Sequence, residues 1–90
     1  MQLRQILRAL GKKTQGKAKI LEILKAAKPK LNEREYWLLE YTYYEKLSVF
    51  NICDKLNLSS SYYQHLMNTA LGKLSVIIDD TTLREMIEII

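Results

Sequence analysis

The chain has 90 residues, of which 48% are hydrophobic and 27% are charged, as in an ordinary globular protein. This length suits one domain with a modest core and is too short for an enzyme with a deep catalytic cleft. No apolar run reaches the length of a membrane span, no cleavable signal pattern begins the chain, and the one cysteine, Cys53, excludes an intrachain disulfide. We therefore expect a cytoplasmic protein without a membrane partner.

The net charge of +4 is concentrated in one part of the chain. Residues 1–30 contain nine Lys or Arg and one Glu, whereas residues 31–90 contain five basic and nine acidic residues. A cationic segment suits contact with DNA phosphates, because each neutralised phosphate releases counterions. We expect this role for Lys12, Lys13, Lys17 and Lys19. The alternative is that these lysines simply solvate a small helical hairpin.

Residues 1–28 predict a basic pair of helices. Apolar residues spaced by three and four predict a helix from Leu3 to Leu10, and Gly11 ends it. Residues 12–16 then form a basic loop, and a second helix extends from Ala18 to Ala27. Pro29 stops that helix, because the residue before a proline is displaced from the helical region.

The next helix is predicted to begin at Asn32 and to end near Tyr44. Asn32 and Glu35 have the spacing of a capping box, in which each side chain accepts a hydrogen bond from the other residue's amide. Aromatic side chains at helical spacing usually lie in the core. We assign to it Trp37, Leu38 and Tyr41.

Two further helical patterns follow, separated by a three-residue break. The first has its apolar face at Val49, Ile52, Cys53 and Leu56. The second has it at Tyr63, Leu66, Ala70, Leu71 and Leu74.

The break itself has the residues of a tight turn. Asn57 tolerates a left-handed helix cap, Leu58 can return to the core, and Ser59 is a good N-cap. Ser61 with Gln64 offers an alternative capping box one turn later. Two helices joined in this way form a helix-turn-helix, whose second helix can enter the DNA major groove.

The last residues predict a short helix after a break at residues 79–82. Thr82 and Glu85 have capping-box spacing. The apolar face of this helix is formed by Leu83, Met86, Ile87 and Ile90. This helix could pack on its own domain or pair with a second copy, so a homodimer through residues 80–90 is one alternative.

Residues 31–74 resemble region four of bacterial sigma factors. The similarity is carried by Leu31–Leu39, by Leu47-Ser48, by Leu56-Asn57-Leu58-Ser59 at the turn, and by Ala70–Leu74. The resemblance implies that residues 31–78 form a DNA-binding helix-turn-helix of a bacterial or phage type. It also implies RNA polymerase as a partner, since region four of sigma factors docks on that enzyme.

The resemblance also implies which residues contact bases and nearby phosphates. The matching positions are Ser59, Ser60, Ser61, Tyr62, Gln64, His65 and Asn68. Gln and Asn can each pair with adenine through two hydrogen bonds. This chain departs from the family in having no arginine on the second helix, where the family typically places several.

Nothing in the chain predicts a catalytic or metal site. His65 is the sole histidine and has no Cys, His or carboxylate cluster at ligand spacing. Cys53 occupies a position where two helices cross, so we interpret it as a small packing residue. We expect no enzymatic activity, no metal and no cofactor.

Together these patterns predict an all-α domain of five to six helices that contains a helix-turn-helix. The predicted function is sequence-specific binding of double-stranded DNA in transcription regulation. The alternative is a sigma-like adaptor that binds RNA polymerase or a sigma factor and barely contacts DNA. A third alternative is an accessory phage-type protein that reuses the fold.

Overall fold

A computed structural model describes residues 2–90, and over this range it contains six α-helices and no β-strand. The helices are α1 (Leu3–Leu10), α2 (Thr14–Ala27), α3 (Glu33–Leu39), α4 (Val49–Leu56), α5 (Ser60–Ile77) and α6 (Asp80–Ile89). A 3-10 turn, Lys28–Lys30, follows α2, and a π-helical turn, Glu40–Tyr44, continues α3. The predicted all-α domain of five to six helices is confirmed.

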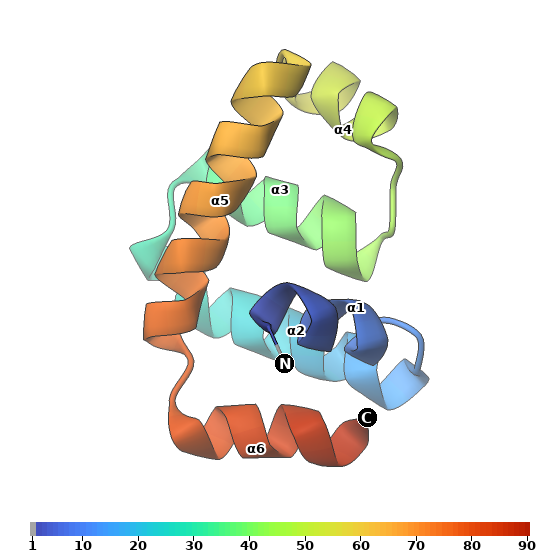
Figure 1. Ribbon diagram of the computed structural model, residues 1–90, viewed down its shortest axis with the longest axis vertical. Helices are drawn as coiled ribbons and strands as arrows, with labels where there is room; N and C mark the ends of the chain where they lie inside the picture. Colours follow the sequence, from blue (N-terminus) through green and yellow to red (C-terminus); the bar gives the residue numbers. More distant parts are fainter. Residues whose placement is uncertain (1) are drawn as a thin grey trace.

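Helix α5 runs along one side of the molecule, and the other helices are stacked beside it (Figure 1). It contacts α4 next to its first turns, then α3, then α1. Helix α6 forms the opposite end of the stack and contacts α1 and α2. None of the helices in residues 2–90 combines the length and apolar character needed to cross a membrane. The core draws on all six helices, and its largest fully buried apolar side chains are Leu7, Leu10, Ile20, Leu24, Leu38, Leu39, Ile52, Leu74 and Met86.

The first two helices agree with the prediction except at the start of α2. Helix α1 ends at Leu10, as expected from Gly11. Helix α2 begins at Thr14 rather than Ala18, so the predicted loop at residues 12–16 is wrong for its second half. Gly16 lies buried in the first turn of α2, where an added Cβ would overlap the carbonyl group of Leu10. The absence of a side chain therefore lets the end of α1 rest directly on α2.

The predicted capping box at the start of α3 is confirmed. The Glu35 amide donates to Asn32 Oδ1 at 2.8 Å, and the Asn32 amide donates to Glu35 Oε1 at 2.9 Å. The core assignment holds fully for Leu38, whereas Trp37 and Tyr41 are half-buried. Their rings stack on each other, with centroids 5.5 Å apart, at the edge of the core. Stacking reduces the area of both aromatic rings that water contacts, although neither ring is fully buried in the core.

Helix α6 packs on its own domain. Its N-cap is Asp79, whose Oδ1 accepts from the Thr82 amide at 2.7 Å, so the predicted Thr82 capping box is wrong. This hydrogen bond lowers the pKa of Asp79 below its ordinary value. Met86 is fully buried, whereas Ile87 and Ile90 remain exposed, so the predicted apolar face is only partly covered. Pairing of two copies through this helix stays a prediction.

An ion pair between the partly exposed Lys73 of α5 and the buried Glu35 joins α5 to the beginning of α3. Lys73 Nζ lies 2.9 Å from Glu35 Oε1, and the Glu35 side chain is 1% exposed. Glu35 is the one charged residue buried in residues 2–90. The same oxygen caps α3, so a single carboxylate fixes both the start of α3 and the position of α5 against it.

Two glycine substitutions should shift stability in opposite directions. Gly16→Ala should lower the free energy of unfolding by about 1–3 kcal/mol, because the new Cβ meets backbone that cannot move away easily. Gly72→Ala should raise it by about 0.5–1 kcal/mol, because Gly72 is exposed within α5 and has open space around it. Urea unfolding followed by circular dichroism measures both. Equal effects at the two positions would contradict the close contact between α1 and α2.

Removing Lys73 should destabilise the domain through Glu35. Lys73→Ala leaves a buried carboxylate without its cation, at a cost of about 1–3 kcal/mol in the free energy of unfolding. Adding Glu35→Gln to this variant should recover part of the loss, because the amide keeps an oxygen to accept from Asn32 and carries no charge. Lys25→Ala, at an exposed position of α2, is the matched control for urea unfolding. A loss no larger than that of the control would show that water compensates Glu35.

Candidate nucleic-acid interface

The turn between α4 and α5 comprises Asn57, Leu58 and Ser59 and has well-defined cap geometry. Asn57 has φ 55°, and its amide donates to the Asp54 carbonyl, while the Leu58 amide donates to the Cys53 carbonyl at 2.9 Å. These two bonds form a Schellman motif, which satisfies carbonyls that the end of α4 would otherwise leave free. The left-handed cap predicted for Asn57 is therefore confirmed.

Ser59 begins α5 as its N-cap. Its Oγ accepts from the Tyr62 amide at 3.1 Å, so the predicted cap is confirmed and the alternative box at Ser61 and Gln64 is wrong. Leu58 is partly buried and packs against the core. The turn thus sets both the angle at which α5 leaves α4 and the rotation of its first turn.

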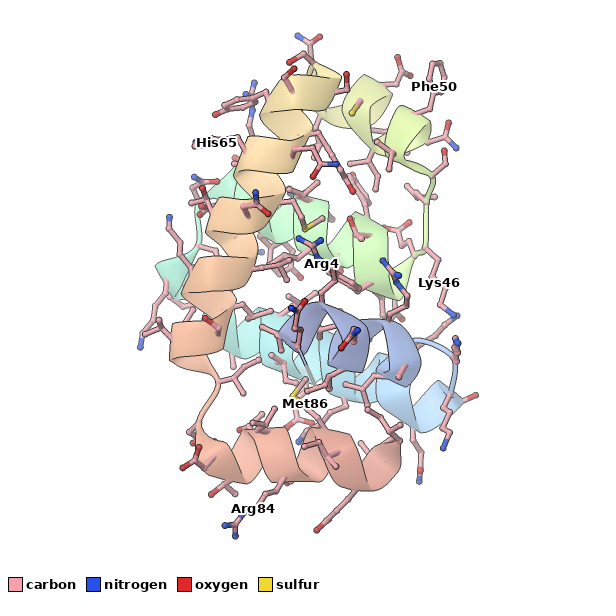
Figure 2. All side chains as sticks on the ribbon, in the orientation of Figure 1. Arg4, Lys46, Phe50, His65, Arg84 and Met86 are labelled. Atoms are coloured by element: carbon pink, nitrogen blue, oxygen red, sulfur yellow. The ribbon has the colours of Figure 1, made fainter. Side chains whose placement is uncertain are left out.

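One side of the first half of α5 is open to solvent. Every position predicted to contact bases is exposed, namely Ser59, Ser60, Ser61, Tyr62, Gln64, His65 and Asn68. The opposite side packs into the core through Tyr63, Leu66 and Met67. Figure 2 shows His65 projecting from α5 away from α4. The rings of Tyr62 and His65 stack with their centroids 6.1 Å apart, so this surface includes an exposed aromatic pair.

This surface carries polar groups but no lysine, arginine, aspartate or glutamate of its own. Between Ser59 and Asn68 the sequence has no Lys, Arg, Asp or Glu. Hydrogen bonds to base edges can therefore come from α5, whereas any strong attraction to phosphates must come from neighbouring elements.

Helix α1 supplies an arginine next to this surface. Arg4 Nη2 lies 3.3 Å from Asn68 Oδ1 and can donate a hydrogen bond to it, joining residues 64 positions apart in the sequence. Figure 2 shows Arg4 above α1, beside the middle of α5. Because its amide oxygen is engaged, Asn68 is a weaker candidate for two-point pairing with adenine than Gln64.

The four lysines predicted to contact phosphates do not form one group. Lys19 is bonded to Glu85 of α6 at 3.2 Å, and its side chain is 11% exposed. Burial alone would lower the pKa of Lys19, but the hydrogen bond to Glu85 and the charges of Glu22 and Glu85 raise it overall. Lys13 Nζ donates to the carbonyl of Ile90 at 2.7 Å. These two lysines hold α6, while Lys12 and Lys17 are exposed.

Three cations outside the predicted set lie where they contact α5 or share a pocket with it, namely Arg4, Arg8 and Lys46. Arg4 and Arg8 are one turn apart on the exposed side of α1, and both lie close enough to Tyr43 to affect the pKa of that residue. Lys46 lies on the connection between the π-turn and α4. The four-residue spacing of the two arginines was a usable signal, but nothing in the sequence places α1 against α5.

A second exposed patch lies on α4. Phe50 is 80% exposed and Val49 is 48% exposed, so the predicted burial of Val49 is wrong. A hollow of about 550 Å³ runs beside them and is bordered by Cys53, Asp54 and Leu58. Figure 2 shows Phe50 projecting from α4 at the end of the molecule opposite α6.

Cys53 and His65 differ in exposure, because His65 lies on the exposed side of α5. Cys53 is a half-buried free thiol that packs against the core. Within residues 2–90 no three His, Cys, Asp or Glu side chains approach closely enough to hold a metal ion.

Comparison with known proteins places this arrangement in a family. No curated protein and no solved structure matches the chain. The family model described as "Protein of unknown function (DUF1492)" matches residues 2–75. This match begins with α1 and extends through almost all of α5, so the basic helical pair and the α4–α5 turn belong to one unit, and α6 lies beyond it. The chain therefore belongs to the DUF1492 family.

Proposed function

We propose that this protein is a sequence-specific DNA-binding regulator of transcription, of a bacterial or phage type and cytoplasmic. In this proposal α4, the turn and α5 form a helix-turn-helix, and the first half of α5 enters the major groove. The observation that carries the proposal is the uninterrupted polar side of α5, exposed from Ser59 to Asn68 and anchored by capped backbone at the turn.

Base contacts and phosphate contacts come from different elements in this proposal. Gln64 offers an amide that can pair with adenine N6 and N7, and the three serines are small enough to adapt to either strand. Arg4, Arg8, Lys12 and Lys46 would bind phosphates at the flank of the groove. Arginine supplied by α1 compensates for the arginines that sigma region four typically carries on its second helix.

One observation favours a second function, that of an adaptor binding RNA polymerase or a sigma factor. Phe50 is 80% exposed and the adjacent Val49 is 48% exposed, and a contiguous exposed apolar patch is a feature of protein interaction sites. Phe50 lies on α4, so such a partner would bind next to the turn.

Substitution of Gln64 should relax base preference at one operator position. Operators selected from random duplexes should lose about 1–3 kcal/mol of discrimination at one base pair in Gln64→Ala, because an adenine contact is removed. Ser75→Ala, exposed at the far end of α5, is the matched control in the same fluorescence-anisotropy titration. Unchanged discrimination at every position in Gln64→Ala would reject α5 as the base-contacting helix.

The salt dependence of duplex binding distinguishes the residues that contact phosphates from the lysines that hold α6. Arg4→Gln should weaken binding to all duplexes and lower the salt slope by about one, because one phosphate contact is lost. Lys19→Gln should leave the slope unchanged, because Lys19 is bonded to Glu85.

The adaptor alternative predicts binding to RNA polymerase that depends on Phe50, and no binding to DNA. Capture of purified RNA polymerase that is abolished by Phe50→Ser, together with no binding to any selected duplex, would replace the DNA-binding proposal by the adaptor.

A further inference from the structure

A basic pocket opens between the end of α1 and the connection that precedes α4. It has a volume of about 390 Å³, within the usual range of ligand sites, and Arg8, Lys12 and Lys46 contribute their charges to it. Its remaining lining includes Tyr43 from the π-turn, Val49 from α4 and Tyr63 from α5. Figure 2 shows Lys46 on this connection, beside the end of α1.

The three cations of the basic pocket have no carboxylate to neutralise them. No Asp or Glu lines the pocket. The ion pairs found in the part of the chain that the structure describes use Lys19 and Lys73, both outside the pocket. Like charges gathered around one cavity repel each other, and an anion in the cavity relieves this repulsion.

The backbone that lines the basic pocket has two unusual conformations, one at Lys46 and one in the π-turn before it. Lys46 has φ 57°, a left-handed conformation that costs a lysine about 1–2 kcal/mol. The π-turn Glu40–Tyr44 ends two residues before Lys46, and π-turns occur frequently at functional sites. Both deviations from regular geometry thus occur where the chain lines the pocket.

Gly11 provides the space that this arrangement needs. An added Cβ at Gly11 would lie 3.0 Å from the Tyr43 carbonyl oxygen and 3.1 Å from Lys46 Cε. The lysine stem therefore lies across the end of α1, next to the helix that carries Arg8. A side chain at position 11 would therefore displace the Lys46 stem or the backbone at Tyr43.

Two further features of the basic pocket favour the binding of an anion. Val49 is the first residue of α4, so the positive end of that helix dipole borders the pocket. Burial raises the pKa of Tyr43, although the charges of Arg4 and Arg8 act in the opposite direction. The phenol is therefore protonated at neutral pH and is a neutral hydrogen-bond donor.

We propose that the basic pocket formed by Arg8, Lys12 and Lys46 binds a phosphate group. Phosphate matches it better than a carboxylate does, because a guanidinium can donate two parallel bonds to it while two ammonium groups approach its other oxygens. The group can belong to a DNA backbone or to a free phosphate. The DNA source rests on the proposed function; Tyr63 borders the pocket from the core-facing side of α5.

The test uses inorganic phosphate with the full-length protein. Titration at constant ionic strength, with chloride as the compensating anion, should give saturable NMR shifts at the amides of Lys46 and Val49. The double variant Arg8→Gln/Lys46→Asn should weaken phosphate binding by about tenfold or more, because two charge-assisted contacts are lost. Asparagine is chosen at position 46 because it tolerates the left-handed backbone.

A second double variant serves as the control, because it removes the same number of positive charges at positions outside the basic pocket. Lys25→Gln/Arg84→Gln removes two exposed cations from α2 and α6 and should retain the affinity of the parent. Figure 2 shows Arg84 projecting from α6, at the end of the molecule away from α4. Shifts that fail to saturate, or equal loss in both double variants, would overturn the phosphate site.

The source of the phosphate is decided by duplex binding of the same variants. A salt slope lowered by about one in Arg8→Gln/Lys46→Asn, relative to the control, assigns the pocket to a backbone phosphate. Saturable phosphate binding with an unchanged slope, or with no duplex binding at all, supports the site and assigns it to a free phosphate. Failure of the DNA-binding proposal is thereby distinguished from failure of the phosphate site.

Discussion

The ion pair between Lys73 and Glu35 is the constraint on which the placement of α5 depends. A helix turns by about 100° per residue, so a shift of one residue in the packing of α5 would bury part of its polar side. A buried carboxylate permits few such shifts, because a misplaced lysine leaves an uncompensated charge in the core. The Schellman turn at Asn57 acts at the other end of the exposed segment. The orientation of Gln64 is therefore determined from both ends of its helix.

Helix α1 connects α5 with the basic residues of the N-terminal third of the chain. It contacts α5 on one side and α6 on the other, and its exposed arginines extend the surface of α5. The family match, residues 2–75, includes α1 and α2 together with the turn, so the matched unit contains the basic pair. Helix α6, outside the match, buries its own Met86 in the core and engages Lys13 and Lys19. Two of the lysines that looked available in the sequence thereby serve stability.

The sequence predicted the features whose determinants are local. Gly11, Asn57 and Ser59 each act on their own backbone, so the end of α1 and the turn before α5 were predicted correctly. The start of α2 was predicted wrongly because Gly16 is a helix breaker by propensity, whereas here it is required by the close approach of Leu10. The pairs Lys73–Glu35 and Arg4–Asn68 span 38 and 64 positions, and no periodicity within one helix can predict them. The candidate base-contacting side was thus predictable, but the cations beside it were not.

The candidate base-contacting part of α5, Ser59 to Asn68, has no lysine or arginine. This lack of charge affects how the surface would select a DNA partner. A helix that carries arginines binds any duplex strongly, and its specificity must overcome that background. Here the polar side of α5 contributes no ionic attraction, so a mismatched operator would lose hydrogen bonds without compensation from charges on the same helix. Under the proposed function the cations would be reached from two places, since Arg4 lies beside α5 at Asn68 whereas Arg8 and Lys46 line the pocket at the end of α1. Affinity would then depend on the orientation of the duplex as well as on its sequence, which favours a regulator over a nonspecific DNA-coating protein.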